Sequence, residues 1–151
     1  MEESRPSFEI RPGEAIGPFA LGMTRDEARE VARREFKAEA RAWDSTAPER
    51  ADFMPDLGIV VSYDADGRCV QVQARFGYAF GDKSTFLFFG NELNWMKDDA
   101  VLQLCKDRWP DVAYGFTGID VPSAGFSAIY YDVPSDGVFC AASVFRAARG
   151  Q

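Results

Sequence analysis

The chain has 151 residues, the length of one average domain, and combines 46% hydrophobic with 27% charged residues. Its 24 acidic side chains outnumber the 17 basic ones, and a net charge of −7 gives no electrostatic reason to bind DNA, RNA or anionic lipid. Histidine is absent, which excludes Ser-His and Cys-His nucleophile pairs, His-ligated metal sites and the commonest general base. The composition therefore favours binding over catalysis.

The three cysteines, Cys69, Cys105 and Cys140, are an odd number and show no CxxC spacing. A disulfide framework is therefore not expected, and three thiols are too few for a structural zinc site. We predict buried thiols in a reducing compartment. The first ten residues carry acids and no apolar run, and no stretch approaches the ~20 apolar residues of a membrane span. These features predict a cytoplasmic protein.

The first predicted helix runs from about Thr24 to Phe36. Thr24 and Glu27 have the S/T-x-x-E spacing of a capping box, in which each side chain satisfies a backbone N–H at the start of the helix. One face carries an apolar stripe at helical spacing, and the charged residues between its members form the opposite, solvated face. The stripe consists of Ala28, Val31, Ala32 and Phe36.

A second helix is expected from about Asp98 to Trp109, where Pro110 ends it. Its apolar stripe copies that of the first helix after a shift of 73 positions, which places Ala28 on Val101. A β-hairpin is predicted downstream of each helix, because runs rich in β-branched and aromatic residues flank an Asp-Gly dipeptide. The paired strands are 58–63 with 69–76, and 126–131 with 138–145.

The repeated order of helix, strand, loop and hairpin indicates an internal duplication, over about 14–77 and about 86–146. Between the repeats, the strand expected at 84–89 is apolar on both faces, as in the centre of a continuous sheet. The chain is therefore predicted to be a single domain, 1–151, of the α+β class. In this prediction two tandem helix-plus-antiparallel-hairpin repeats form one mainly antiparallel sheet with the helices on one face.

No group of residues has the pattern of a catalytic or metal site. Asp64-Ala-Asp66-Gly67 is similar to the start of a calcium loop, but Gln73 stands where the loop needs Glu, and a tight hairpin turn explains the acids. The acid pair Asp98-Asp99 falls at a helix start, where capping explains it. A cysteine nucleophile would have no His base. We therefore expect no catalytic residue, no metal and no cofactor, and we predict that the protein is not an enzyme.

The alternation along the hairpin strands predicts a binding surface. Val70, Val72, Ala74 and Phe76 are expected to face the helices, and Cys69 lies with Gln71, Gln73 and Arg75 on the less buried face. Alignment of the repeats adds Ala128, Tyr130, Ala142 and Val144 to that face. Tyr and Arg are typical anchors of protein interfaces, although a lightly decorated solvent face explains the same pattern. The candidate partner-binding residues are Gln71, Gln73, Arg75, Tyr130, Val60, Ser62, Val144, Asp64 and Trp43.

The segment Leu21 to Glu27 reads Leu-Gly-Met-Thr-x-x-Glu, and it opens a helix that is followed by strands and a hairpin. This order, occurring twice, resembles the tandem-repeat architecture of the beta-lactamase inhibitory protein family. The same opening is similar to the small outer-membrane assembly lipoproteins that share the single repeat unit. The resemblance implies two helix-plus-sheet units side by side, with a concave sheet face that grips another protein. The family's paired cysteines and secretion signal are missing, which argues against an extracellular beta-lactamase as the target.

An acidic chain of this size also resembles a bacterial immunity protein, which blocks a cognate toxin. We therefore expect a non-enzymatic protein-binding inhibitor that neutralises a toxin or enzyme by occluding its active site. Its acidic balance favours a basic protein partner, and neither nucleic acid nor membrane. The alternatives are a scaffold subunit that dimerises through a sheet edge, and a small-ligand-binding protein or enzyme. The latter would have an aromatic pocket near the repeat seam, lined by Phe80, Phe86, Phe88 and Trp95.

Overall fold

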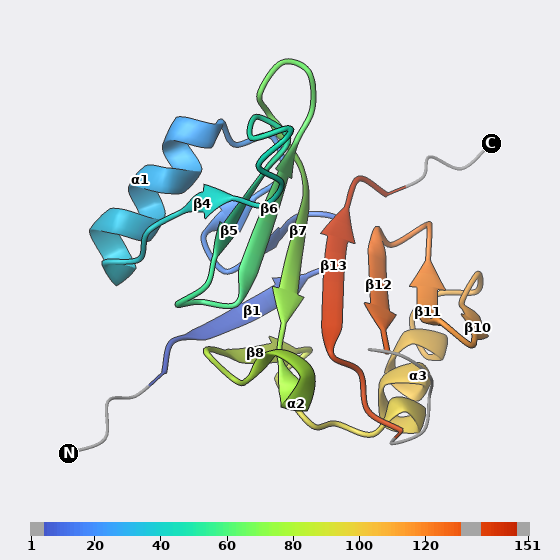
Figure 1. Cartoon of the computed structure of the whole chain (residues 1–151). Coiled ribbons are helices and arrows are strands. Elements are labelled where there is room, and N and C mark those ends of the chain that lie inside the picture. The colour runs from blue at the N-terminus through green and yellow to red at the C-terminus, as the bar shows by residue number, and fades with distance from the viewer. Residues whose placement is uncertain (1–4, 131–136, 148–151) are drawn as a thin grey trace.

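Strands make up most of the structure, and they form two sheets (Figure 1). The computed structural model describes residues 5–130 and 137–147, without the side chains of Tyr78 and Ala79. The larger sheet has eight antiparallel strands. Their spatial order is β10 (Ala113–Gly115), β11 (Gly118–Val121), β12 (Phe126–Ile129), β13 (Ala141–Phe145), β7 (Cys69–Arg75), β6 (Ile59–Tyr63), β5 (Ala51–Met54) and β4 (Arg41–Ala42).

The smaller sheet has five strands, and its centre is a parallel pair from distant parts of the chain. Phe8 of β1 lies opposite Phe86 of β8 in that pair. The strand order is β3 (Phe19–Ala20), β2 (Ala15–Ile16), β1 (Ser7–Arg11), β8 (Thr85–Phe88) and β9 (Asn91–Glu92). All other pairings in this sheet are antiparallel.

The predicted α+β class, with two helix-plus-hairpin repeats in one sheet and the helices on one face, is wrong. The described residues contain thirteen strands but only two helices longer than one turn, and the strands form two sheets. Two segments account for the error. Residues 7–20 supply three strands that were not predicted, and the expected loop at 44–56 contains β5. The strand at 85–88 belongs to the smaller sheet, so it is not the centre of one continuous sheet.

Helix α1 (Arg25–Phe36) begins where its capping signal predicts. The Thr24 side chain accepts a hydrogen bond from the Glu27 backbone N–H at 3.2 Å, and Glu27 accepts one from the Thr24 N–H at 2.9 Å. Both halves of the predicted capping box are thus confirmed. Two small residues of the apolar stripe, Ala28 and Ala32, are fully buried, so the helix lies close against the strands beneath it.

Helix α3 (Asp98–Lys106) confirms the second helix but ends three residues before Trp109. Val101 and Cys105 of its apolar stripe are buried. The third helical segment, α2 (Gly77–Phe80), is a single turn between β7 and β8. Strands β6 with β7 and β12 with β13 pair antiparallel, as predicted for the hairpins. Tyr131 and Asp136 of the second predicted hairpin lie outside the described residues.

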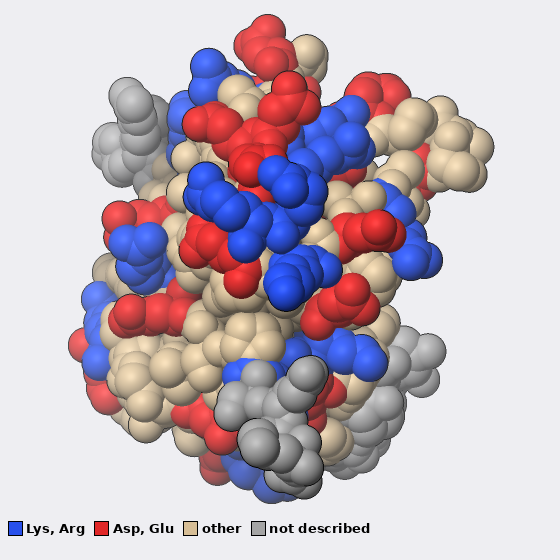
Figure 2. All heavy atoms as spheres, turned by 90° about the vertical axis from the view of Figure 1, so that its left-hand side faces the viewer, with Lys and Arg blue, Asp and Glu red and all other residues tan. Residues whose placement is uncertain are grey.

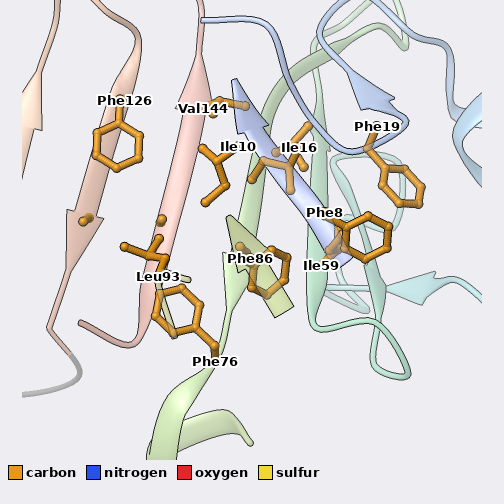
Figure 3. Close-up of a cluster of buried hydrophobic side chains, with 14 of the residues drawn as sticks. Phe8, Ile10, Ile16, Phe19, Ile59, Phe76, Phe86, Leu93, Phe126 and Val144 are labelled. Carbon is orange, nitrogen blue, oxygen red and sulfur yellow. The ribbon is translucent and has the colours of Figure 1, made fainter. Parts of the chain in front are cut away.

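One hydrophobic core joins the two sheets (Figure 3). The parallel pair contributes Phe8, Ile10 and Phe86, and the large sheet contributes side chains such as Ile59 and Phe126. Aromatic contacts cross between the sheets: Phe88 of β8 stacks on Phe126 of β12 with ring centroids 4.6 Å apart. Such a pair adds about 0.5–1.5 kcal/mol to what burial alone contributes. Within the described ranges, no helix is long and apolar enough to cross a bilayer.

A β-bulge reverses the predicted orientation of Cys69 and Val70. The β6–β7 pairing shifts between Ser62 and Tyr63, so Tyr63 lies opposite Cys69 and one residue of β7 is left over. Cys69 is therefore buried in the core, while Val70 is 43% exposed. All three thiols are free and buried, and burial raises the pKa of Cys69 to about 11 and that of Cys105 to about 12. The expected exposure of Cys69 is wrong.

Candidate protein-binding face of the large sheet

One face of the large sheet points away from the core, and we call it the outer face. Directly opposed residues of antiparallel strands point to the same side, so the side chains opposite Gln71, Gln73 and Arg75, the partly exposed positions of β7, identify the face. Gln73 of β7 pairs with Ser143 of the neighbouring strand β13 and with Val60 of the other neighbouring strand, β6. The outer face of the central strands consists of Ala51, Phe53, Val60, Ser62, Gln71, Gln73, Arg75, Ala141, Ser143, Phe145, Ser127 and Ile129.

Polar side chains in the middle of the outer face are linked across strands. The Arg75 Nε donates to the Gln73 Oε1 at 2.9 Å, and the Gln73 Nε2 donates to the Ser143 Oγ at 3.2 Å. All three groups are at most partly exposed. Because each hydrogen bond restricts a rotatable side chain, the row presents its remaining donors and acceptors in a fixed arrangement.

Arg75 is also the centre of an aromatic stack. Its guanidinium carbon lies 4.4 Å from the ring centroid of Trp43 and 4.2 Å from that of Phe80, so both rings pack against the guanidinium. Phe53 packs against the edge of Trp43 with centroids 5.2 Å apart. Cation–π contacts contribute about 0.5–2 kcal/mol each, more where water is excluded. The stack therefore holds both Arg75 and the 44% exposed Trp43 in place.

The backbone under Arg75 depends on a glycine. Gly58 has a φ of +69°, and a Cβ at this position would lie 2.7 Å from the Arg75 carbonyl oxygen. The Arg75 N–H donates to the Gly58 carbonyl at 2.8 Å. Only a residue without a side chain combines this left-handed conformation with so close an approach.

Six of the nine predicted site residues line one recess of about 260 Å³: Trp43, Val60, Ser62, Gln71, Gln73 and Arg75. Trp43 and Ser62 also line a larger hollow of about 750 Å³, so the two depressions adjoin. Asp64, a seventh predicted residue, lies in that hollow with two arginines, Arg25 and Arg50. The structure thus brings seven of the predicted residues together around strands β6 and β7.

The other two predicted residues, Tyr130 and Val144, are on the opposite side. Val144 is fully buried, and Tyr130 donates to the Asp98 Oδ2 at 2.6 Å at the start of α3. Ala128 and Ala142 are buried in the same core. The error comes from the repeat alignment: a slip of one residue turns every side chain of a strand to the other face. Ile129, next to Tyr130 in the chain, lies on the outer face, opposite Ala141.

Sequence reasoning missed three residues of this surface. Phe53 lies on β5, inside the segment 44–56 that the sequence predicts as a loop. Ser143 was missed because the register of β13 differs by one residue from the one that the repeat alignment predicts. Phe80 reaches the surface through the single-turn helix α2 and a contact with Arg75, which no local pattern indicates.

The residues of the alternative aromatic pocket do not come together. Phe86 and Phe88 are fully buried in the core, whereas Phe80 covers Arg75. Trp95 is half exposed, and its Nε1 donates to Asp82 on the surface. The acids of the Asp64–Gly67 segment serve the hairpin turn, because the Asp64 Oδ1 accepts from the Asp66 and Arg68 N–H groups. Among the residues placed by the structure, no group of three Cys, Asp or Glu side chains could hold a metal ion.

The side of the molecule formed by α1 differs in character from the outer face. Figure 2 shows basic and acidic side chains intermixed there, with no large area of one sign. Arg33 pairs with Glu30 of the same helix at 2.7 Å, and Arg34 lies 3.4 Å from Glu35. Such exposed pairs contribute at most about 1 kcal/mol and leave little charge unmatched.

Scans against protein-family models, curated proteins and solved structures find no match to this chain. The resemblances to the beta-lactamase inhibitory protein family and to immunity proteins therefore stay predictions from the sequence.

Proposed function

We propose that this chain is a non-enzymatic protein-binding inhibitor that acts in the cytoplasm. In this proposal it is an immunity protein, and its outer face occludes the active site of a cognate bacterial toxin or enzyme. The observation that carries the proposal is the stack of Trp43, Arg75 and Phe80 beside the recess. Trp and Arg are the residue types that most often dominate protein interfaces, above all where they are already ordered.

The lining of the depressions supports a protein partner over a small ligand. Ligand sites are mostly apolar and enclosed, but five of the eleven residues around the larger hollow are charged. These are Arg25, Asp44, Glu49, Arg50 and Asp64. A mixed polar rim next to a central aromatic anchor is typical of protein–protein interfaces.

Net charge and local charge act at different stages of binding. The charge of −7 favours the approach of a basic protein, because long-range attraction raises the association rate. At close range the outer face presents Arg75 in its centre. A basic partner that carries an acidic group at the contact satisfies both the long-range attraction and the short-range contact with Arg75.

The test measures neutralisation of the protein encoded beside this chain's gene. We expect co-expression to relieve the toxicity of that protein, and we expect Trp43→Ala, Gln73→Ala and Arg75→Glu to abolish the relief. Central Trp and Arg residues each contribute about 2 kcal/mol of binding energy. Calorimetry should therefore show that Kd rises about 30-fold for Trp43→Ala and for Arg75→Glu.

Arg33→Ala, which removes a surface charge from α1, is the matched control and should neutralise as the wild type does. Thermal unfolding of each variant shows whether the fold is kept. The proposal fails if folded outer-face variants neutralise fully, or if Arg33→Ala alone loses activity.

A further inference from the structure

We propose that the recess beside Arg75 is a receptor for one side-chain carboxylate, an Asp or Glu of the protein partner. This inference rests on the proposed function and names the chemistry that its central contact recognises. Its basis is the placement of Arg75, the donors around it and the size of the recess.

Arg75 is a cation without a counter-charge. It forms no salt bridge with a carboxylate anywhere in residues 5–130 and 137–147, although it is only partly exposed. Burial lowers the pKa of its guanidinium, which reflects the loss of water around the charge. Partly buried charges are normally paired, so an anion supplied from outside would complete this site.

The orientation of Arg75 suits a carboxylate. The rings of Trp43 and Phe80 both pack against the guanidinium, and its Nε–H donates to the Gln73 Oε1. The two terminal nitrogens make no hydrogen bond with any described residue, which leaves the end of the fork available. A guanidinium fork held in this way matches the two oxygens of a carboxylate.

Two further donors line the same recess. The Ser62 hydroxyl and the Gln71 amide both border it, and neither side chain is hydrogen-bonded to a residue that the structure describes. Two of the three acids of the adjoining hollow are engaged in local turns, since Asp44 accepts from Thr46 and Asp64 accepts from Asp66 and Arg68. The third, Glu49, lines the hollow but not the recess. The recess is therefore rich in donors.

The size and the net charge favour a protein side chain over a free anion. A recess of about 260 Å³ accommodates one acidic side chain together with the backbone that carries it. The net charge of −7 opposes the approach of small, multiply charged anions such as phosphates. A carboxylate on a basic protein meets no such barrier.

The test uses the full chain and N-acetyl-L-glutamic acid α-methylamide, a probe with a single side-chain carboxylate. NMR follows the Arg75 Nε–H and the side-chain amides of Gln71 and Gln73. We expect these resonances to shift saturably with the probe, and to stay in place with the corresponding glutamine derivative. Arg75→Gln should abolish the response, and Arg75→Lys should weaken it at least about fivefold, because an ammonium lacks the fork.

Arg41→Gln is the matched control, because Arg41 is an exposed cation on the outer face opposite Phe53 and outside the recess. It should leave the response unchanged. Equal shifts with the glutamine derivative, or shifts that survive Arg75→Gln, overturn the proposal. So does a stronger response to inorganic phosphate or acetate than to the glutamic acid probe, which would identify a site for free anions.

The partner experiment separates this inference from the proposed function. If the probe fails to bind while Trp43→Ala still abolishes neutralisation, the protein-binding face stands and the carboxylate receptor is wrong. If the probe binds at Arg75 while every outer-face variant neutralises fully, the receptor stands and the proposed function is wrong.

Discussion

Asp52 shows how one carboxylate fixes a helix on the large sheet. It is fully buried on β5, and it accepts hydrogen bonds from Arg29 at 2.8 and 3.0 Å and from the Tyr63 hydroxyl at 2.9 Å. Arg25 lies 3.8 Å away. The hydrogen bond to Asp52 raises the pKa of Arg29. Arg29 was expected on the solvated face of its helix, but the structure places its head group on a buried acid.

We predict that Arg29→Ala lowers the free energy of unfolding by about 2–3 kcal/mol, because it leaves a buried carboxylate with fewer partners. Tyr63 and Arg25 remain near Asp52, which keeps the loss below that of a fully orphaned charge. Urea unfolding measures the change. Arg33→Ala, four residues along the same helix and paired only at the surface, should stay within about 0.5 kcal/mol. Equal losses for both variants would show that Asp52 does not anchor α1.

At the scale of single elements, strand β7 combines two kinds of signal. Its strand propensity and its turn with β6 were predicted from the sequence, but its bulge was not. Simple alternation places Val70 and Val72 on the same buried face. The bulge instead leaves Val70 43% exposed and Val72 fully buried.

This difference gives a matched pair of substitutions. We predict that Val72→Thr lowers the free energy of unfolding by about 1–3 kcal/mol, because it buries a hydroxyl without a partner in an apolar core. Val70→Thr changes shape and polarity in the same way at the exposed position, and should stay within about 0.5 kcal/mol. Chemical denaturation of both variants decides between the bulged strand and a regular one, since regular alternation requires similar losses at both sites.

The elements with strong local signals could be predicted, and the relations between them could not. Thr24 and Glu27 mark the start of α1 through contacts within one turn, and the Asp66-Gly67 turn places the β6–β7 hairpin. Most of the candidate binding surface follows from alternation within that hairpin. Strands β12 and β13 have no independent marker of register, so the alignment of the repeats places Tyr130 and Val144 on the wrong face. The stack on Arg75 joins residues from separate elements, which local patterns do not report.

At the scale of the whole molecule, two strand pairings connect the two halves of the chain. Strand β1 pairs with β8 in the small sheet, and β7 pairs with β13 in the large sheet. Phe8 and Phe76 of the first half both pack on Phe86 of the second half, with ring centroids 6.0 and 5.7 Å apart. These non-local contacts were invisible to a search for repeats, which compares each half with the other but not their shared core.

We predict that neither half folds alone. The fragment 1–82 contains β1 and β7 but lacks β8 and β13, the strands with which they pair in the other half, so the interior faces of two sheets would be exposed to water. The fragment 83–151 loses the same two pairings and retains only about 70 residues, a length at which one core is already marginal. Circular dichroism should show no cooperative unfolding for either fragment, whereas the full chain should unfold in a single transition. Mixing the fragments should restore the folded spectrum, because the missing strands are supplied in trans. A fragment 1–82 that unfolds cooperatively by itself would contradict this, and would show that each half is an independent folding unit.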